Sequence, residues 1–144
     1  DVVWGTLDVL IVDLPPGTSD ASLTVMQSLP VGGVVMVTSP QDLAGMVVRK
    51  AAQMASALNV PLLGLIENMS HAVCPDCGKE IQVFGPSHAD EVAGRLGVPL
   101  LGRLPLDPEM AAAGDAGAIE KYTNSRFNEI AARVMERLGV RDRA

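Results

Sequence analysis

The chain has 144 residues, of which 48% are apolar and only 3% aromatic, and its formal net charge is −6. This length predicts one domain whose core is built from Val, Leu, Ile, Met and Ala. Because the Lys and Arg residues are scattered and no apolar run is long enough for a bilayer, we expect neither a nucleic-acid nor a membrane partner.

The first residues of the chain and its cysteine usage indicate whether it is a fragment and in which compartment it works. Aspartate is not a natural initiator and an apolar run begins by Leu7, so we expect a fragment whose N-terminal strands are missing. No signal-peptide pattern is present, and the only two cysteines form one close pair. That usage is typical of the reducing cytoplasm.

Four short apolar runs predict strands, because turn-forming residues bound them and they are apolar on both faces. The runs cover residues 7–12, 34–38, 61–66 and 99–102. Strands of this kind are typical of a parallel sheet that is covered by helices on both sides.

Apolar residues at helical spacing separate these runs. They predict helices over 43–58, from a Ser87-x-x-Asp90 capping box to Gly97, and from Ser125 to Leu138. The alternation predicts an α/β fold of three layers, with helices flanking a mostly parallel sheet through right-handed crossovers. Residues 71–84 fit neither pattern, and we expect them to leave the domain as an excursion.

Polar, turn-forming residues follow the predicted strands at 13–20, 39–42 and 67–70. Ligands of open α/β sheets bind outside the carboxyl ends of the strands. We therefore expect the functional site at this edge.

Asp13 ends the first predicted strand, and Gly17 follows four residues later. An aspartate at that position can hold Mg²⁺ through water, and a glycine amide can approach a phosphate closely. A strand end followed by a simple turn explains the same residues. Asn68 could read a base edge with its amide, although a turn residue is the simpler interpretation.

Cys74 and Cys77 are the strongest chemical signal in the sequence. Their spacing lets both thiolates bind one metal, and Gly78 permits the backbone to turn its N–H groups toward sulfur. A half zinc ribbon, a redox dithiol and two unligated thiols are the alternatives. Because Gly78 and an extended segment follow instead of a helix, a metal-binding turn is favoured over a redox dithiol.

The cysteine pair supplies only half of a four-thiolate zinc or iron–sulfur site. A two-fold symmetric dimer could complete it with the same pair from each subunit. The spacing does not distinguish zinc from iron–sulfur. We expect His71 to be a solvent-exposed loop histidine and not a ligand. Asp107 and Asp115 are explained by helix capping and turns.

Six motifs occur in one order along the chain. They are Asp13-Leu14-Pro15-Pro16-Gly17-Thr18, Thr38-Ser39-Pro40-Gln41-Asp42, Glu67-Asn68-Met69-Ser70, Cys74-Pro75-Asp76-Cys77-Gly78, Phe84-Gly85 and Pro105-Leu106-Asp107-Pro108. With them the chain resembles the Mrp/ApbC-type iron–sulfur cluster carrier ATPases, relatives of the MinD/ParA P-loop proteins, from about Trp4 to the last helix. The first motif is shared by the wider group, and its combination with the Asn-Met-Ser and Cys-Pro-x-Cys-Gly motifs is more specific.

The resemblance implies a P-loop NTPase-like fold, of which residues 1–144 are the C-terminal part and residues 71–84 the metal-binding loop. It implies that Cys74 and Cys77 bridge a [4Fe–4S] cluster across a homodimer, with zinc as the possible occupant in its place. Proteins of this kind bind ATP, hydrolyse it slowly and pass clusters to apo iron–sulfur proteins in the cytoplasm.

The resemblance also implies a nucleotide site. Asp13 would be the Walker B-type, Mg²⁺-associated aspartate, and Gly17 would belong to the switch II loop that senses the γ-phosphate. Asn68 would line the adenine pocket together with three consecutive residues, Pro105, Leu106 and Asp107.

The sequence departs from the family pattern in two ways. Ser19 stands where members often have glycine, which a helix-capping serine can replace. No Gly-x-x-x-x-Gly-Lys-[Ser/Thr] loop occurs in the 144 residues, and in the family that loop lies upstream. We therefore expect this chain alone to lack ATPase activity, although the longer parent would be a slow ATPase.

Two other functions are compatible with parts of the sequence. A MinD/ParA-like positioning ATPase fits the first motif but needs no paired thiolates, and a zinc-stabilised interaction module fits the cysteines without catalysis. A fragment of this kind should also expose apolar sheet surface and an open edge, so we expect it to self-associate. Its positive mean hydropathy of +0.26 agrees in direction.

Overall fold

The structure is a computed structural model, and it describes residues 2–140 of the chain. Its elements in chain order are α1 (Asp20–Ser28), β1 (Val34–Thr38), α2 (Asp42–Ala57), β2 (Leu62–Glu67), β3 (Ala72–Val73), β4 (Glu80–Ile81), α3 (Ala89–Leu96), β5 (Leu100–Arg103), α4 (Pro108–Asp115), the 3-10 helix η1 (Ile119–Lys121) and α5 (Ser125–Leu138).

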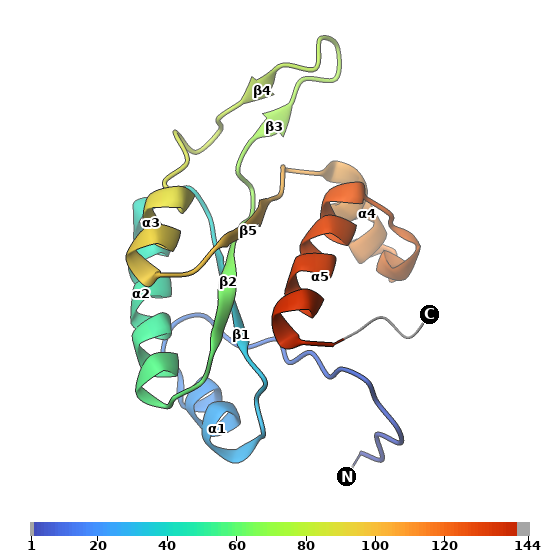
Figure 1. Cartoon of the computed structure of the whole chain (residues 1–144). Helices are drawn as coiled ribbons and strands as arrows, with labels where there is room; N and C mark the ends of the chain where they lie inside the picture. The colour runs from blue at the N-terminus through green and yellow to red at the C-terminus, as the bar shows by residue number, and fades with distance from the viewer. Residues whose placement is uncertain (1, 141–144) are drawn as a thin grey trace.

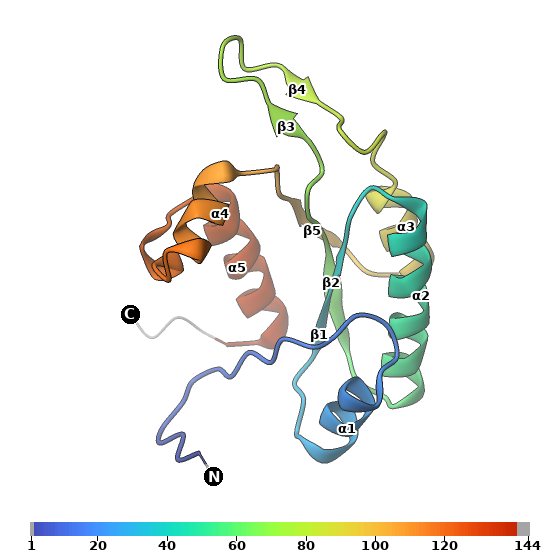
Figure 2. The same cartoon turned by 180° about the vertical axis from the view of Figure 1, so that it is seen from behind.

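The main sheet has three parallel strands in the order β1-β2-β5. Helices α2 and α3 cover one face of it, and α5 lies on the other face with α4 beside it (Figures 1 and 2). These are the three layers and the parallel sheet that the alternating pattern predicts. The strands expected at 34–38, 61–66 and 99–102 are confirmed to within about a residue at each end.

The core lies mainly between the sheet and the α2–α3 layer. Its buried residues on this side are Met26, Met36, Val48, Ala52, Ala55, Val60, Leu65, Ala89, Val92 and Ala93. A smaller cluster on the α5 side consists of Leu101, Leu104 and Ile130. The α5 layer is therefore held by far fewer buried side chains than the α2–α3 layer.

Gly102 explains how α5 can approach the sheet. A Cβ built on Gly102 would lie 2.6 Å from the Cγ1 atom of Ile130, which is too close for any real side chain. Ile130 is the buried residue of α5, so the glycine provides the space into which the helix packs.

The strand expected over residues 7–12 is wrong. Within residues 2–19 the structure has no regular element, and the apolar side chains of this region are exposed: Val2, Val3, Trp4, Leu7, Val9, Leu10, Ile11 and Val12. A strand forms only where a neighbouring strand pairs with its backbone. The sheet in the described residues consists of β1, β2 and β5 alone, and none of them pairs with residues 7–12.

Helix caps follow local sequence in most places. Ser19 caps α1 by accepting the Ser22 N–H, as expected for a capping serine. The last helix begins at Ser125 as predicted, although its cap is Asn124, whose side chain accepts the Arg126 N–H. None of the helices within residues 2–140 combines the length and apolar character needed to cross a membrane.

The capping box predicted for α3 is only half formed. Ser87 Oγ does accept the Ala89 N–H at 3.3 Å, but the residue that directly precedes the helix is His88. The Asp90 carboxylate does not turn back to the cap, because it is held by Arg103. A stronger charged partner from the neighbouring strand thus replaces the local contact.

Candidate functional site

The paired cysteines lie at the turn of the β3–β4 hairpin, which projects beyond the carboxyl ends of the sheet strands (Figure 1). This hairpin occupies most of the segment 71–84 that was expected to leave the domain. Its two strands are antiparallel, with Ala72 opposite Ile81 and Val73 opposite Glu80. The cysteines are therefore carried on a short arm, away from the core.

Two backbone hydrogen bonds close the cysteine turn. The Cys74 N–H donates to the Lys79 carbonyl at 2.9 Å, and the Gly78 N–H donates to the Cys74 carbonyl at 2.9 Å. Gly78 has a φ of +70°, a left-handed conformation that favours glycine at this position. The glycine thus lets the chain fold back after the second cysteine.

The turn also favours the thiolate form of Cys74. The backbone N–H of Cys77, then that of Asp76, then the Cys77 side chain hydrogen-bond to Cys74 and lower the pKa of its thiol. Cys74 is half-buried and Cys77 is exposed, and both are free thiols. Thiolates that accept backbone N–H groups are suited to bind a soft metal.

No third ligand joins the two cysteines within residues 2–140. No group of three or more His, Cys, Asp or Glu side chains in that range could hold a metal ion. His71 is not a solvent-exposed loop residue, and that expectation is wrong because the side chain is buried at the base of the hairpin. A metal at the turn must therefore take its remaining ligands from outside the described part of the chain.

The base of the hairpin is fixed to the end of β5. Ser70 donates its N–H to the Leu104 carbonyl at 2.9 Å, and its Oγ donates to the same carbonyl at 3.0 Å. The Leu106 N–H donates to the His71 carbonyl at 2.7 Å. The His71 ring lies between Ser70 Oγ, 2.8 Å from Nδ1, and Glu80 Oε1, 3.3 Å from Nε2.

A cavity of about 300 Å³ lies at the carboxyl ends of β1 and β2, between α2 and α3. It is at the sheet edge where the sequence predicts a site. Its polar lining comes from Thr38, Ser39, Gln41, Asp42, Arg49, Glu67, His88, Glu91 and Arg95. The charges are of both signs, so the cavity does not have the strongly basic lining of a dedicated phosphate site.

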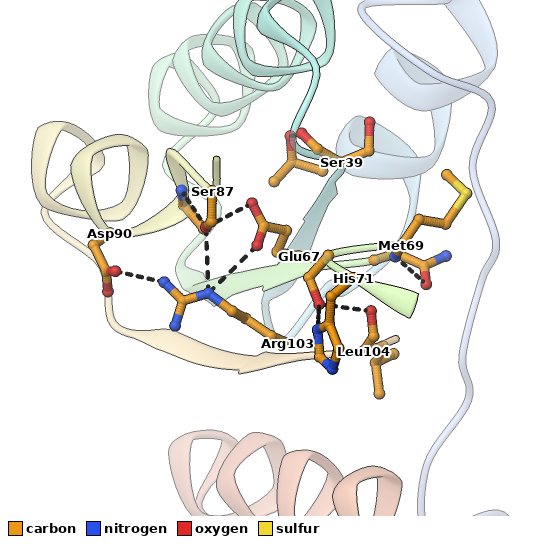
Figure 3. Close-up of polar contacts among 12 residues, drawn as sticks. Ser39, Glu67, Met69, His71, Ser87, Asp90, Arg103 and Leu104 are labelled. Atoms are coloured by element: carbon orange, nitrogen blue, oxygen red, sulfur yellow. Dashed lines mark hydrogen bonds and ion pairs between the residues drawn. The ribbon is translucent and has the colours of Figure 1, made fainter. Parts of the chain in front are cut away.

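A polar network joins the end of β2 to β5 and α3 (Figure 3). The fully buried Glu67 accepts a hydrogen bond from Ser87 Oγ at 2.9 Å, and its Oε2 lies 3.4 Å from Arg103 Nε. Arg103 also donates to Ser87 Oγ at 3.3 Å and pairs with the exposed Asp90. A buried carboxylate needs such partners, because an unpaired charge in the interior is costly.

In the sequence, Glu67 stands out only as part of a polar sheet edge and of the Glu67-Asn68-Met69-Ser70 motif, and Arg103 does not stand out at all. A signal was available, since each is a charged residue at the end of an apolar run. In the parallel pairing of β2 with β5, Glu67 is the register partner of Arg103. Opposite charges at equivalent ends of adjacent strands could have predicted the pair.

Asp13 and Gly17 lie apart from this cavity. Asp13 is exposed in the irregular segment before α1, and Gly17 lies beside α2, where an added Cβ would be 3.8 Å from Val47 Cγ1. Neither residue lines the 300 Å³ cavity. The structure therefore does not bring these two candidates together with the polar network at the end of β2.

Asn68 and the segment 105–107 lie after neighbouring strands. The Asn68 N–H donates to the Thr38 carbonyl at 2.8 Å, and its side-chain oxygen accepts the Met69 N–H at 2.9 Å. Pro105 and Leu106 follow directly on the Leu104 carbonyl that Ser70 contacts. The two segments are thus adjacent through the hydrogen bonds between 70–71 and 104–106.

Asp107 is the cap of α4, which confirms the interpretation of this residue as a helix cap. Its carboxylate accepts the Glu109 N–H at 2.9 Å and the Met110 N–H at 3.3 Å, and Tyr122 donates its hydroxyl to it. The Tyr122 hydroxyl, followed by the two helix N–H groups, holds the pKa of Asp107 below its usual value despite partial desolvation. The same contact raises the pKa of Tyr122.

Comparison with known families gives a match over residues 1–139, to the ParA group described as NUBPL iron-transfer P-loop NTPase. The chain belongs to this family. The resemblance inferred from the motifs and the predicted α/β fold class are thereby confirmed.

Relatives from several organisms carry the name "Iron-sulfur cluster carrier protein". The protein from Methanocaldococcus jannaschii is 43% identical over 143 residues, which is 96% of this chain and 49% of the relative. The protein from Saccharolobus solfataricus is 47% identical over 118 residues, 81% of this chain and 40% of the relative. The chain thus spans about half, or less than half, of the length of these relatives.

A solved structure has the same fold. It is a nucleotide-binding protein from Archaeoglobus fulgidus in complex with ADP, with cobalt, and its sequence is 41% identical. The TM-score is 0.76, with 86% of this chain and 51% of that chain covered. A three-layer P-loop NTPase-type fold is therefore shared by this family member and a protein that binds nucleotide.

Proposed function

We propose that the chain is the cluster-binding, C-terminal part of an ATP-dependent iron–sulfur cluster carrier. The observation that carries the proposal is the projecting turn, in which two free thiols meet with no third ligand within residues 2–140. Backbone N–H groups stabilise the thiolate there. The relatives are named as iron–sulfur cluster carriers, and cysteine thiolates bind iron–sulfur clusters well. An iron–sulfur cluster is therefore the cargo that we infer for this turn.

The cargo would be a [4Fe–4S] cluster shared across a homodimer. Two-fold symmetry places Cys74 and Cys77 of one copy opposite the same pair of the other, which supplies four thiolates. An exposed turn lets thiolates of an apo iron–sulfur protein replace these ligands one after another. The cluster then passes to the recipient without a change in its iron, sulfide or electron count.

The nucleotide would bind at the carboxyl edge of the sheet in the longer protein. Asp13 would be associated with Mg²⁺ and Gly17 with the γ-phosphate, while Asn68 and the segment 105–107 would contact adenine. The related protein in complex with ADP supports a nucleotide site in this fold. The 144 residues contain no Gly-x-x-x-x-Gly-Lys-[Ser/Thr] loop, so this chain by itself would not hydrolyse ATP. We place the protein in the cytoplasm.

Metal analysis of the longer protein tests the cluster proposal. After anaerobic reconstitution, we expect about four irons and four sulfides per dimer, lost on Cys74→Ala or Cys77→Ala. Asp76→Ala is the matched control, because this exposed residue lies in the same turn without supplying a thiolate. Zinc without transferable iron would instead favour an interaction module, and no bound metal would favour a positioning ATPase.

A separate assay tests the nucleotide proposal. The 144-residue chain should release no phosphate from ATP above the background of a Cys74→Ala, Cys77→Ala double variant or of buffer. Turnover by the chain alone would contradict the assignment of the phosphate cradle to the longer protein.

A further inference from the structure

The segment that carries the cysteines, residues 68–86, is closed by a hydrogen bond between the residues that flank it. Glu67 ends β2 directly before this cysteine arm, and Ser87 follows the arm shortly before α3. Ser87 Oγ donates to Glu67 Oε1 at 2.9 Å, although the two residues are 20 positions apart (Figure 3). The cysteine arm thus leaves the domain and returns to it at one contact.

Arg103 joins this contact from the neighbouring strand. Its Nε donates to Ser87 Oγ at 3.3 Å and lies 3.4 Å from Glu67 Oε2. The Glu67 carbonyl also accepts the Leu104 N–H at 2.8 Å. Both flanks of the cysteine arm are therefore fixed to the end of β5.

The segments assigned to the nucleotide site begin beside these same residues. Asn68 directly follows Glu67, and Pro105 comes two residues after Arg103. Because each pair is so close along the chain, a ligand that moves Asn68 or Pro105 also moves a member of the charged contact.

Two arrangements of this contact are possible, because Arg103 Nε carries only one hydrogen. That hydrogen is donated to Ser87 Oγ, while Glu67 Oε2 is buried and has no hydrogen-bond partner among residues 2–140. The distances of 3.3 and 3.4 Å both exceed the roughly 2.7–2.9 Å of a tight charge-assisted hydrogen bond. A small shift of Arg103 toward Glu67 would strengthen the ion pair and release Ser87.

We propose that Glu67 is a positioning residue that couples the nucleotide edge to the cysteine arm. A nucleotide held by Asn68 and residues 105–107 shifts Arg103 from Ser87 toward Glu67, which loosens the returning end of the arm. Metal at the cysteines favours the closed arm and so weakens nucleotide binding by the same factor, since coupling between two sites is reciprocal. The inference rests on the proposed function, because it requires a nucleotide at this edge.

A purely structural role for Glu67 has a different consequence. A buried carboxylate paired with an arginine would then support the fold equally, whichever ligand is bound. Its loss would lower stability, or weaken nucleotide binding in the metal-free and metal-loaded protein alike. The ratio of the two nucleotide affinities is therefore the quantity that separates coupling from structural support.

Calorimetry on the longer protein measures this ratio. The dissociation constant of ADP with Mg²⁺ is determined for metal-free protein and for protein loaded with Zn²⁺ at the cysteines. We expect metal-loaded wild type to bind ADP about fivefold more weakly than metal-free wild type. The ratio should be near one in Glu67→Gln and in Ser87→Ala, because each variant leaves Arg103 with only one of its two partners.

The control is Glu91→Gln, which removes an exposed carboxylate from α3 outside the contact and should keep the wild-type ratio. Ser87→Ala decides the outcome if Glu67→Gln does not fold, since it removes a hydroxyl and no buried charge. A wild-type ratio of one would overturn the proposal, as would a variant ratio equal to that of wild type.

Amide exchange tests the closure of the arm without a nucleotide. The Ser70 and Leu106 N–H groups join the root of the arm to the segment after β5. In the metal-free 144-residue chain, Ser87→Ala should speed their exchange about fivefold relative to the Leu65 N–H in the sheet. Unchanged rates would show that Ser87 does not hold the arm and would contradict the proposal.

These measurements also separate the coupling from the proposed function. If ADP bound and the cluster assembled but the ADP ratio were one, the proposed function would stand and the coupling would fall. If ADP did not bind to the longer protein, the nucleotide assignment would fall and the coupling with it. The cluster proposal would then be judged by its iron and sulfide content alone.

Discussion

Two apolar runs of this chain have similar compositions, but one forms a buried strand and the other is irregular and exposed. Residues 62–67 form β2 in the centre of the sheet, where Leu65 is fully buried. Residues 7–12 form no strand, and Ile11 is 87% exposed. The difference is in the neighbours, since β2 pairs with β1 on one side and β5 on the other. An apolar run can thus form a strand, but it does so only when neighbouring strands pair with it.

Truncating one residue from each run is the strongest test of this comparison. Leu65→Ala should lower the free energy of unfolding by about 2–5 kcal/mol, because it removes buried methyl groups from a packed core. Ile11→Ala should change it by less than about 0.5 kcal/mol, because the side chain is already in water. Urea unfolding followed by circular dichroism measures both. Equal losses would mean that residues 7–12 are packed in solution.

A second test compares two glycines instead of two runs. Gly102→Ala should destabilise the chain by about 1–3 kcal/mol, because the new Cβ would meet Ile130 and push α5 from the sheet. Gly94→Ala, in α3 with no atom within 4 Å of the added carbon, should stabilise it by roughly 0.5–1 kcal/mol. A stable Gly102→Ala variant with unchanged unfolding would show that α5 does not rest on β5.

The exposed apolar run at residues 7–12 should also promote self-association of the chain. Because its apolar side chains face water, the chain should self-associate and bind the dye ANS. Ile11→Lys should reduce the sedimentation coefficient at high concentration and the dye fluorescence, whereas Glu129→Lys, on the surface of α5, should not. A wild-type chain that sediments as a clean monomer without bound dye would show that the run is covered.

The same contrast explains how much the sequence could predict. The strands at 34–38, 61–66 and 99–102 and the helices near 43–58 and 125–138 were recognisable, because periodicity and turn residues are local signals. The cap at Asp107 was recognisable for the same reason. The family was predictable from short motifs whose order is also fixed along the chain.

Contacts between segments distant in sequence were not predictable in the same way. Ser87 accepts the Ala89 N–H as a cap does, but its hydroxyl also donates to Glu67, 20 residues away, and accepts from Arg103, 16 residues away. The loop position of His71 suggested exposure, but its side chain is buried at the base of the hairpin, where the backbone hydrogen-bonds to Leu104 and Leu106 after β5. The roles of Asp13, Gly17, Asn68, Cys74 and Cys77 depend on a nucleotide, a cluster or a second copy, so they remain predictions.

The smallest expected effect concerns a local contact, between Tyr122 and Asp107. The Tyr122 hydroxyl lowers the pKa of Asp107 relative to the unfolded chain, so this contact stabilises the folded state above the normal carboxyl pKa of about 4. That contribution is lost as the pH falls through the lower, folded-state pKa. Tyr122→Phe should therefore be slightly less stable than wild type at about pH 7, and the difference should shrink at about pH 3.

Tyr122 is the single tyrosine of the chain, so its ionisation can be followed by absorbance without interference from another tyrosine. The absorbance titration of Tyr122 should have its midpoint above that of free tyrosine, about pH 10, because Asp107 accepts the hydroxyl proton. Asp107→Asn should move the midpoint down, and Asp115→Asn at the far end of α4 should leave it in place. An unshifted wild-type titration would show that the α4 cap and Tyr122 are not joined in solution. In that case even a local contact would depend on more distant packing.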